Sequence, residues 1–338
     1  MYSFRNDYSE GAHPAVLRAL EETNLAQSCG YGLDPYCAKA AATIRALCGD
    51  EEADVHFVVG GTQANLLVIH AFLRSYEAVI AAHTGHVNVH ETGAIELTGH
   101  KVVAVPCPGD GKLTPERILG AVKAHATEHM VHPRMVYLSN TTEVGTLYTK
   151  GELEAIYRCC RENGLFLYLD GARLGSALTA PGSDLTWADI YRCTDAFTIG
   201  GTKNGLFFGE AIILRAPELR PHFRSYMKQR GAMLAKGRLL GVQFDALFTD
   251  GLYFKIGAHA IEKAERLKRM FREQGYDFYI NSPTNQQFVV LTDKKAEELR
   301  RNVRFTVWEK PDEKHTVARF CTSWATTDEE LDELDALL

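Results

Sequence analysis

The stretch Ala196-Phe-Thr-Ile-Gly-Gly-Thr-Lys203-Asn-Gly205 leads from an apolar run of strand type into a glycine-rich turn that presents a lysine. A second apolar run, Leu165–Leu169, ends at Asp170. A lysine and a carboxylate at strand ends of one α/β sheet indicate pyridoxal phosphate chemistry. The amine can form a Schiff base with the cofactor aldehyde, and the carboxylate can keep the pyridine nitrogen protonated. These two stretches therefore predict both a fold and a cofactor.

Short β-rich apolar runs alternate with segments of helical period through much of the chain. The runs are Val55–Val59, Ala78–Ala82, Lys101–Val105, Met135–Ser139, Leu165–Leu169, Ala196–Ile199 and Ala211–Leu214. This alternation predicts an α/β fold, with a mostly parallel seven-stranded sheet between helices. Ligands bind at the carboxyl ends of such strands. We therefore expect Gly60-Gly61-Thr62, Asn140, Asp170 and Lys203 to meet at one edge.

The pattern changes after Ala232 to a long helical stretch that is broken near Asp250-Gly251. The strand-type runs Gln287–Leu291, Val303–Trp308 and Val317–Thr322 then intersperse with the helical segments Lys294–Asn302 and Thr327–Leu337. We interpret this as a small α+β domain. The predicted domains are residues 1–240, a large cofactor-binding domain that includes the N-terminal segment, and residues 241–338.

Composition excludes several classes of function. The 338 residues are 46% hydrophobic and 24% charged, and the net charge of −6 makes nucleic acid an unexpected partner. No apolar run reaches the roughly 18 residues that a spanning helix needs, so we expect no membrane partner and a cytoplasmic location. The eight cysteines form no Cys-x-x-Cys pair, and we expect reduced, mostly buried thiols.

Gly60-Gly61-Thr62-Gln63-Ala64-Asn65 follows a strand and precedes a helix that we expect from Asn65 through Arg74. Its backbone N–H groups and the Thr62 hydroxyl could hold a phosphate at the positive end of the helix. Alternatively, the glycines only make the turn and Thr62 caps the helix. The motif alone does not decide between these two interpretations.

Asp170 ends a strand too apolar to tolerate an unpaired carboxylate, so it needs a cationic or hydrogen-bonded partner. A pyridinium N–H would serve. A structural salt bridge to Arg173 is the alternative, although the planar guanidinium of Arg173 could equally bind a ligand carboxylate.

Histidines add further candidates. His86 and His90 have the i, i+4 spacing of a helical metal pair, but no third ligand is evident, so we expect no metal. We expect instead that the imidazole of His86 lies on a flat cofactor ring. His129 lies in a polar connection where a histidine is usually solvated. Arg319 lies in a strand-type run, where alternation could simply turn it to solvent.

The order of these motifs resembles the low-specificity L-threonine aldolases, fold-type I pyridoxal phosphate enzymes related to the β-eliminating lyases. The matching segments are Arg5-Asn6-Asp7, Tyr31-Gly32-Leu33-Asp34-Pro35, Gly60 to Asn65, His86 with Glu91 and Gly93, and Asp170-Gly-Ala-Arg173. Asn6 stands where the family has a serine near the substrate carboxylate, and Gly-Gly-Thr-Lys-Asn-Gly replaces the commoner Ser-Lys-Gly-Leu-Gly-Ala.

The resemblance implies a role for each candidate. Lys203 carries pyridoxal 5'-phosphate, His86 stacks on its ring, Asp170 binds its nitrogen, and Gly61 and Thr62 hold its phosphate. Arg173, which is also close to the cofactor, and Arg319 bind the substrate carboxylate, with Asn6 and Tyr31 as further substrate contacts. His129, 11 residues before Asn140, matches a histidine that contacts the substrate hydroxyl. Tyr31 belongs to a neighbouring subunit's site, which implies a homodimer or homotetramer.

The implied reaction is cleavage of the Cα–Cβ bond of a β-hydroxy-α-amino acid to glycine and an aldehyde, with His129 or a water that it holds as the base. A β-eliminating lyase of the same fold and, from a different class, a non-catalytic binding protein are the alternatives. The preferred side chain, the choice between threonine and allo-threonine, and the choice between dimer and tetramer stay open in the sequence.

Overall fold

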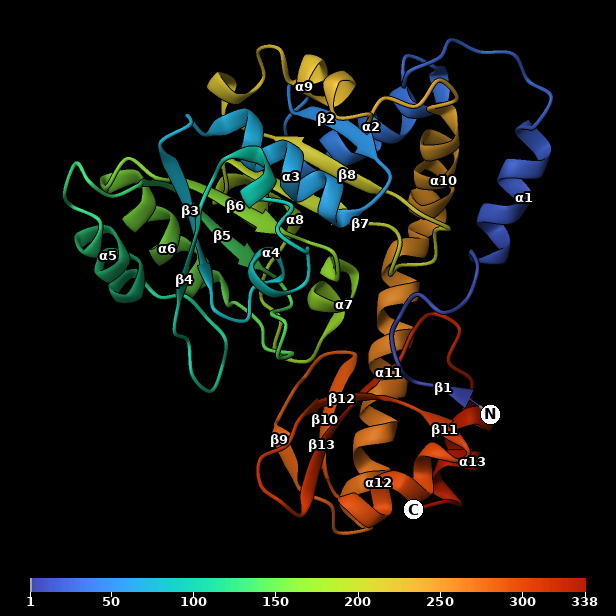
Figure 1. Cartoon of the computed structure of the whole chain (residues 1–338). Coiled ribbons are helices and arrows are strands. Elements are labelled where there is room, and N and C mark those ends of the chain that lie inside the picture. Colours follow the sequence, from blue (N-terminus) through green and yellow to red (C-terminus); the bar gives the residue numbers. More distant parts are fainter. Residues whose placement is uncertain (1) are drawn as a thin grey trace.

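A seven-stranded sheet with the order β2-β8-β7-β6-β5-β3-β4 forms the centre of the larger domain (Figure 1). The structure is a computed structural model, and it describes residues 2–338. The strands are β2 (Asp54–Val58), β3 (Glu77–Ala82), β4 (Val102–Val105), β5 (His132–Ser139), β6 (Phe166–Asp170), β7 (Ala196–Gly200) and β8 (Glu210–Leu214). Within this sheet β8 alone runs in the direction opposite to the other strands. The seven predicted strands and the mostly parallel sheet are confirmed.

Both faces of this sheet are buried. Every residue of β6, β7 and β8 is buried, as expected for strands covered on both sides. Leu167 and Leu169 of β6 pack into one core, whereas Phe166 and Tyr168 pack into the other. The period of two along the strand therefore divides one apolar run between two cores.

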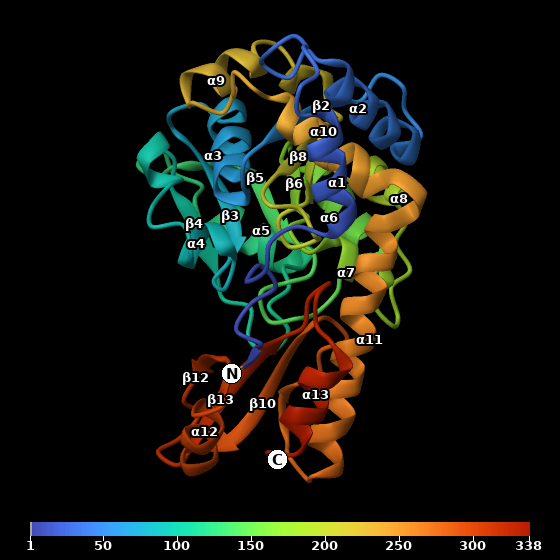
Figure 2. The same cartoon turned by 90° about the vertical axis from the view of Figure 1, so that its right-hand side faces the viewer.

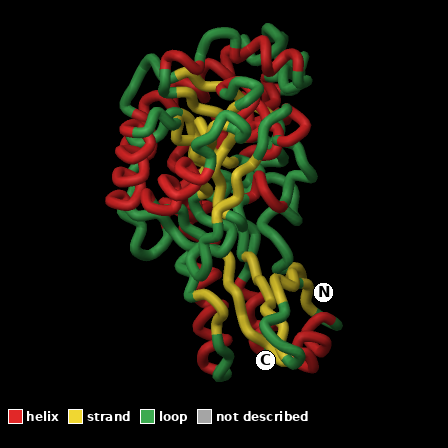
Figure 3. The backbone as a smooth tube through the Cα atoms, turned by 60° about the vertical axis from the view of Figure 1, so that its left-hand side comes forward, coloured by secondary structure: helices red, strands yellow, loops and turns green. Residues whose placement is uncertain are grey.

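Helices cover both sides of the large sheet, as the strands between helices in Figure 3 show. They are α1 (Pro14–Thr23), α2 (Pro35–Cys48), α3 (Gly61–Phe72), α4 (His86–Val89), α5 (Pro115–Ala124), α6 (Lys150–Glu162), α7 (Leu174–Thr179), α8 (Trp187–Arg192), α9 (Phe223–Gln229) and α10 (Arg238–Phe248), with short 3₁₀ turns at Glu96–Thr98, Pro217–Leu219 and Thr249–Gly251. Among the described residues, no helix combines the length and the apolar character that crossing a membrane requires.

The smaller domain is built on an antiparallel sheet with the order β12-β13-β10-β9. Its elements are β9 (Phe278–Ile280), β10 (Gln286–Thr292), α12 (Asp293–Arg300), β11 (Val303–Arg304), β12 (Thr306–Glu309), β13 (His315–Cys321) and α13 (Asp328–Asp335). The long helix α11 (Leu252–Glu273) packs on α7 and continues into the smaller domain (Figure 2). The small domain has its own apolar core.

The N-terminus departs from the predicted domain division. Strand β1 (Tyr2–Ser3) pairs in parallel with β11, and the side chain of Phe4 packs in the core of the small domain. The structure therefore places residues 2–4 with the C-terminal domain, not with residues 5–240. The N-terminal segment thus pairs with a strand that is distant in sequence. This pairing satisfies backbone groups of a short strand that no local pattern marks.

Candidate active site

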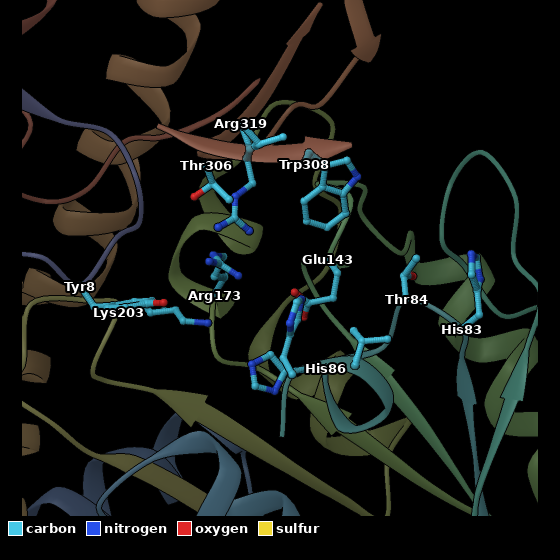
Figure 4. Close-up of a pocket in the computed structure, with 13 residues that line it drawn as sticks. Tyr8, His83, Thr84, His86, Glu143, Arg173, Lys203, Thr306, Trp308 and Arg319 are labelled. Atoms are coloured by element: carbon cyan, nitrogen blue, oxygen red, sulfur yellow. The ribbon is translucent and has the colours of Figure 1, made fainter. Parts of the chain in front are cut away.

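Two adjoining cavities lie at the carboxyl edge of the large sheet, and Lys203 lines both of them. The larger, of about 620 Å³, is lined by Tyr8, His83, Thr84, His86, Val89, His90, Glu143, Arg173, Lys203, Thr306, Val307, Trp308 and Arg319 (Figure 4). The smaller, of about 280 Å³, contains Gly60, Gly61, Thr62, Asn65, Asp170, Thr202 and Glu210 among its lining residues. The structure thus brings Gly61, Thr62, His86, Asp170, Arg173, Lys203 and Arg319 together, as the sequence predicts.

Lys203 follows β7 in a tight turn. In this turn, the backbone N–H of Gly201 donates a hydrogen bond to the carbonyl oxygen of Gly209 at 2.9 Å. A side chain at Gly200 would place its Cβ 2.3 Å from the carbonyl oxygen of Ala172, so only glycine lets the strand end approach the segment after Asp170. The glycines before Lys203 therefore set the lysine beside the strand-end carboxylate.

Asp170 is held by hydrogen bonds on both of its oxygens. Its Oδ2 accepts from the hydroxyl of Tyr137 at 2.7 Å and from Nδ2 of Asn65 at 3.1 Å, and its Oδ1 accepts from the backbone N–H of Ala172 at 2.9 Å. Burial and the neighbouring carboxylates raise the pKa of Tyr137 well above its ordinary value, so the phenol remains a donor. A carboxylate fixed in this way can face a pyridinium nitrogen at the cavity wall.

Asn65 joins Asp170 to the histidine of the site. The same amide nitrogen that donates to Asp170 lies 2.7 Å from Oε1 of Glu91, which in turn accepts from Nδ1 of His86 at 2.7 Å. Burial acts to lower the pKa of His86, but the bond to Glu91 and nearby carboxylates outweigh it, so the pKa is raised. One network therefore orients two groups expected to contact the cofactor.

Helix α3 begins at Gly61, four residues earlier than predicted, and Gly60 occupies the position before it. No side chain caps this end, so the interpretation of Thr62 as a capping residue is wrong. A Cβ added at Gly60 or at Gly61 would meet no atom within 4 Å, which leaves open space over the helix terminus. Free N–H groups beside open space fit a phosphate group.

Arg173 forms a buried bidentate pair with Asp7. Nε donates to Oδ2 at 2.7 Å and Nη2 donates to Oδ1 at 3.0 Å. The alternative of a salt bridge between Asp170 and Arg173 is therefore wrong. Asn6, the neighbour of Asp7, uses its side-chain oxygen to accept from the backbone N–H of Tyr8 and from the hydroxyl of Ser9, and it lines neither cavity.

Arg319 reaches the larger cavity from β13 in the small domain, so its pattern-based alternative of pointing to solvent is wrong. Its guanidinium lies 5.6 Å from the ring centroid of Trp308, and Nη1 donates to Oε1 of Gln286 at 3.3 Å. Its buried Nε has no partner among residues 2–338. A ligand carboxylate could accept from this free donor.

Glu210 is a further buried carboxylate, placed at the start of β8. Its Oε2 has no hydrogen-bond partner in the described chain. Burial and the charge of Asp170 raise its pKa well above the ordinary value, although Lys203 acts to lower it. Ionisation of this carboxyl group is therefore disfavoured by its surroundings.

Besides Asn6, two further predicted site residues lie outside the cavities of Lys203. His129 is exposed in the turn before β5, at the amino end of that strand and thus at the edge of the sheet opposite the site. Tyr31 is 43% exposed and lines a separate cavity with Leu33 and Arg224. Neither lines the cavities of Lys203, so a role for either residue would need a second chain.

Sequence patterns missed Asp7, Tyr8, Asn65, Glu143, Thr306, Trp308 and Glu210 as parts of the site. Asn65 could have been found from its position in the turn motif. Glu143 could have been found because it lies just after a strand that ends at the ligand-binding edge. The structure shows no cluster of three or more potential metal ligands within residues 2–338.

Comparisons with known proteins agree with this geometry. A family model described as beta-eliminating lyase matches residues 4–302. Low-specificity L-threonine aldolases of Pseudomonas sp. (strain NCIMB 10558) and Pseudomonas aeruginosa are 34% and 33% identical, over 98% of this chain and over 96% and 95% of theirs. A threonine aldolase structure from Leishmania major is 49% identical, with a TM-score of 0.98, covering 100% of this chain and 98% of that one.

An aspartate aminotransferase from Thermus thermophilus, a double mutant, is 16% identical and has a TM-score of 0.74, covering 100% of this chain and 92% of its own. This likeness concerns the fold alone. Fold and site together define a fold-type I pyridoxal phosphate enzyme, and the resemblance stated from the sequence is confirmed. The chain belongs to the beta-eliminating lyase family, with low-specificity L-threonine aldolases among its relatives.

Proposed function

We propose that the protein is a pyridoxal-phosphate-dependent aldolase that cleaves β-hydroxy-α-amino acids, of the L-threonine or L-allo-threonine type, to glycine and an aldehyde. The observation that carries this proposal is the meeting of Lys203, Asp170, Arg173 and Arg319 at adjoining cavities beside an uncapped helix terminus. The names of the relatives at 34% and 49% identity support the same reaction.

The residues at the smaller cavity fit the cofactor. Lys203 would supply the amine for covalent attachment, Asp170 would bind the pyridine nitrogen, and the start of α3 with Thr62 would hold the phosphate. His86, oriented by Glu91, would contact the ring. When bound, pyridoxal phosphate supplies a sink for the electrons of the broken bond.

The larger cavity holds the amino acid. Asp7 uses only some of the N–H groups of Arg173, and Nε of Arg319 has no partner in the described chain. The two guanidinium groups can therefore bind the same substrate carboxylate. Because that carboxylate is fixed, the arginines also determine how the other substituents of Cα are oriented. A substrate that enters between the two domains becomes enclosed by β12 and β13 on one side and by the large sheet on the other.

A β-eliminating lyase is the second candidate, because the family model carries that description. Product analysis separates the two reactions. The holoenzyme is incubated with L-threonine, L-allo-threonine and L-serine, and aldehyde, glycine, keto acid and ammonia are quantified. Glycine and aldehyde in equal amounts support the aldolase, whereas keto acid and ammonia without glycine would assign the protein to the eliminating lyases.

The assembly that we propose is a homodimer or a dimer of dimers in the cytoplasm. Leu25, Tyr31 and Leu33 are 92%, 43% and 68% exposed, which suits a surface that a second copy covers. Arg224 donates to the carbonyl oxygen of Tyr31 at 3.0 Å, so this loop is held in place. All eight cysteines are free and seven are buried, which supports a reducing compartment.

A further inference from the structure

Glu143 is a buried carboxylate that the proposed chemistry has not yet used. It lies in the segment Asn140-Thr141-Thr142-Glu143 that follows β5, and only 7% of it is exposed. It lines both cavities that contain Lys203. No residue within 2–338 donates a hydrogen bond to its carboxylate or forms an ion pair with it.

Most of Glu143 is buried, but its oxygens are not among the fully buried polar atoms that lack a partner in residues 2–338, so the carboxylate opens into the cavity where a ligand can reach it. Three other carboxylates of the site have partners: Asp7 holds Arg173, Glu91 holds His86, and Asp170 accepts three hydrogen bonds. Glu210, whose Oε2 has no partner in the described chain, lines only the smaller cavity. A ligand that donates a hydrogen bond would satisfy Glu143. This requirement distinguishes Glu143 from the residues that only support the site.

The layout of the larger cavity shows which part of a substrate lies near Glu143. If the function proposed above holds, on which this inference rests, the substrate amine lies at Lys203 and its carboxylate at Arg173 and Arg319. In Figure 4, Glu143 lies between His86 and Trp308, across the cavity from Lys203. The β-substituent is the part of the amino acid left to face it.

Other candidate bases fit less well. His129 is exposed at the opposite edge of the sheet. His86 already uses Nδ1 toward Glu91 and has its ring assigned to the cofactor. His90 lines the same cavity but is exposed, so it is less firmly positioned than a buried carboxylate. Glu143 has both position and a free acceptor.

We propose that Glu143 accepts the hydrogen bond of the substrate's β-hydroxyl group and takes its proton when the Cα–Cβ bond breaks. The proton moves to a carboxylate oxygen of Glu143, and the electron pair of the O–H bond becomes the second bond of the aldehyde carbonyl. The Cα–Cβ electron pair stays with the glycine fragment, which takes up one proton from solvent at Cα, and Glu143 releases the proton it accepted to solvent. Amino acid goes to glycine and aldehyde with no other reactant.

The test uses the holoenzyme and the variant Glu143→Gln, which keeps shape but cannot accept the proton as a carboxylate does. We expect kcat for cleavage to fall by roughly 10²- to 10⁴-fold, the range for a positioned acid–base group. KM should stay within a few-fold of the wild type, and exchange of the glycine α-proton with solvent deuterium should be retained. Glu162→Gln, an exposed change of the same kind at the end of α6, is the matched control.

Two results would overturn the role of Glu143: cleavage by Glu143→Gln within tenfold of wild type, or an equal fall in cleavage and in α-proton exchange, which indicates a disturbed cofactor site. Thermal midpoints are measured alongside. If the amide weakens the fold, Glu143→Asp serves instead, with reduced cleavage and normal exchange expected, and unchanged cleavage as the contrary result. If the wild-type protein forms no aldehyde, the proposed function is refuted. If the wild type forms aldehyde and the variants behave otherwise than expected, only the role of Glu143 is refuted.

Discussion

Asp7 and Arg173, which are 166 positions apart in the chain, form a buried bidentate ion pair at the junction of the two domains. Nδ2 of Asn285 also donates to Asp7, at 2.9 Å, so the carboxylate is bound from both the large and the small domain. The pair fixes the guanidinium whose remaining donors face the larger cavity. Substrate binding and domain packing therefore depend on the same carboxylate.

Replacing Asp7 should reveal both roles. Asp7→Asn leaves the buried charge of Arg173 uncompensated, so we expect the free energy of unfolding to fall by about 3–5 kcal/mol. The KM for the amino acid should rise because the guanidinium loses its orientation. Asp245→Asn, which removes an exposed pair with Lys39, is the control and should cost about 1 kcal/mol or less. Urea unfolding curves check this, and equal losses in the two variants would argue against the coupling.

The pH dependence of stability tests the same pair. Burial acts to raise the pKa of Asp7, but Arg173 and Lys203 outweigh it and lower the pKa to about 2 from 3.8. A lowered carboxyl pKa gives stability that is present above the unfolded value and is lost as pH falls through the folded value. The stability difference between wild type and Asp7→Asn should stay constant from pH 8 to about 4 and shrink between about 4 and 2. A difference that shrinks already between pH 7 and 5 would contradict this assignment.

Gly61→Ala tests the proposed phosphate site at the start of α3. A Cβ at this position meets no protein atom, so the fold should be unharmed, but the methyl group enters the space where the phosphate would lie. We expect weaker binding of pyridoxal phosphate, by tenfold or more, with no loss of thermal stability in the cofactor-free protein. Gly120→Ala in α5, which is also free of contacts, is the control and should gain about 0.5–1 kcal/mol without changing cofactor affinity. Unchanged affinity in Gly61→Ala would place the phosphate elsewhere.

The assembly can be tested at Tyr31. If this residue serves a neighbouring subunit, the protein should be at least dimeric by light scattering, and Tyr31→Ala should lower activity although Tyr31 lines no cavity of Lys203 in its own chain. Leu97→Ala, at another exposed apolar residue, is the comparison and should leave activity unchanged. A monomer with full activity would contradict the proposed assembly.

The sequence predicts the parts of the fold whose signals are local. Seven apolar runs became the seven strands, of which β3, β6, β7 and β8 are buried at every residue. The residues at the strand ends met at one edge because parallel strands require it. The pairing of β1 with β11 was missed because a strand of two residues carries no period. The run Val303–Trp308 proved to be two strands, β11 and β12, because each pairs with a different partner.

Site residues, too, could be predicted only where the sequence around them carries a local signal. Lys203 and Asp170 could be predicted because strand and turn chemistry mark them. The partner of Arg173 could not, because Asp7 is brought to it only by the path of the N-terminal segment between the domains. His129 was predicted from a motif spacing alone, and the structure places it at the opposite edge of the sheet because it precedes β5 instead of following it.

The proposed chemistry requires the lysine after β7 to carry the cofactor, and mapping the attachment site shows whether it does. The holoenzyme is reduced with borohydride, digested, and analysed by peptide mass spectrometry, with Lys203→Ala treated in parallel. We expect a pyridoxyl group on the peptide that contains Lys203 and none on any peptide of the variant. A pyridoxyl group on another lysine of the wild type, or stoichiometric labelling of Lys203→Ala, would contradict it.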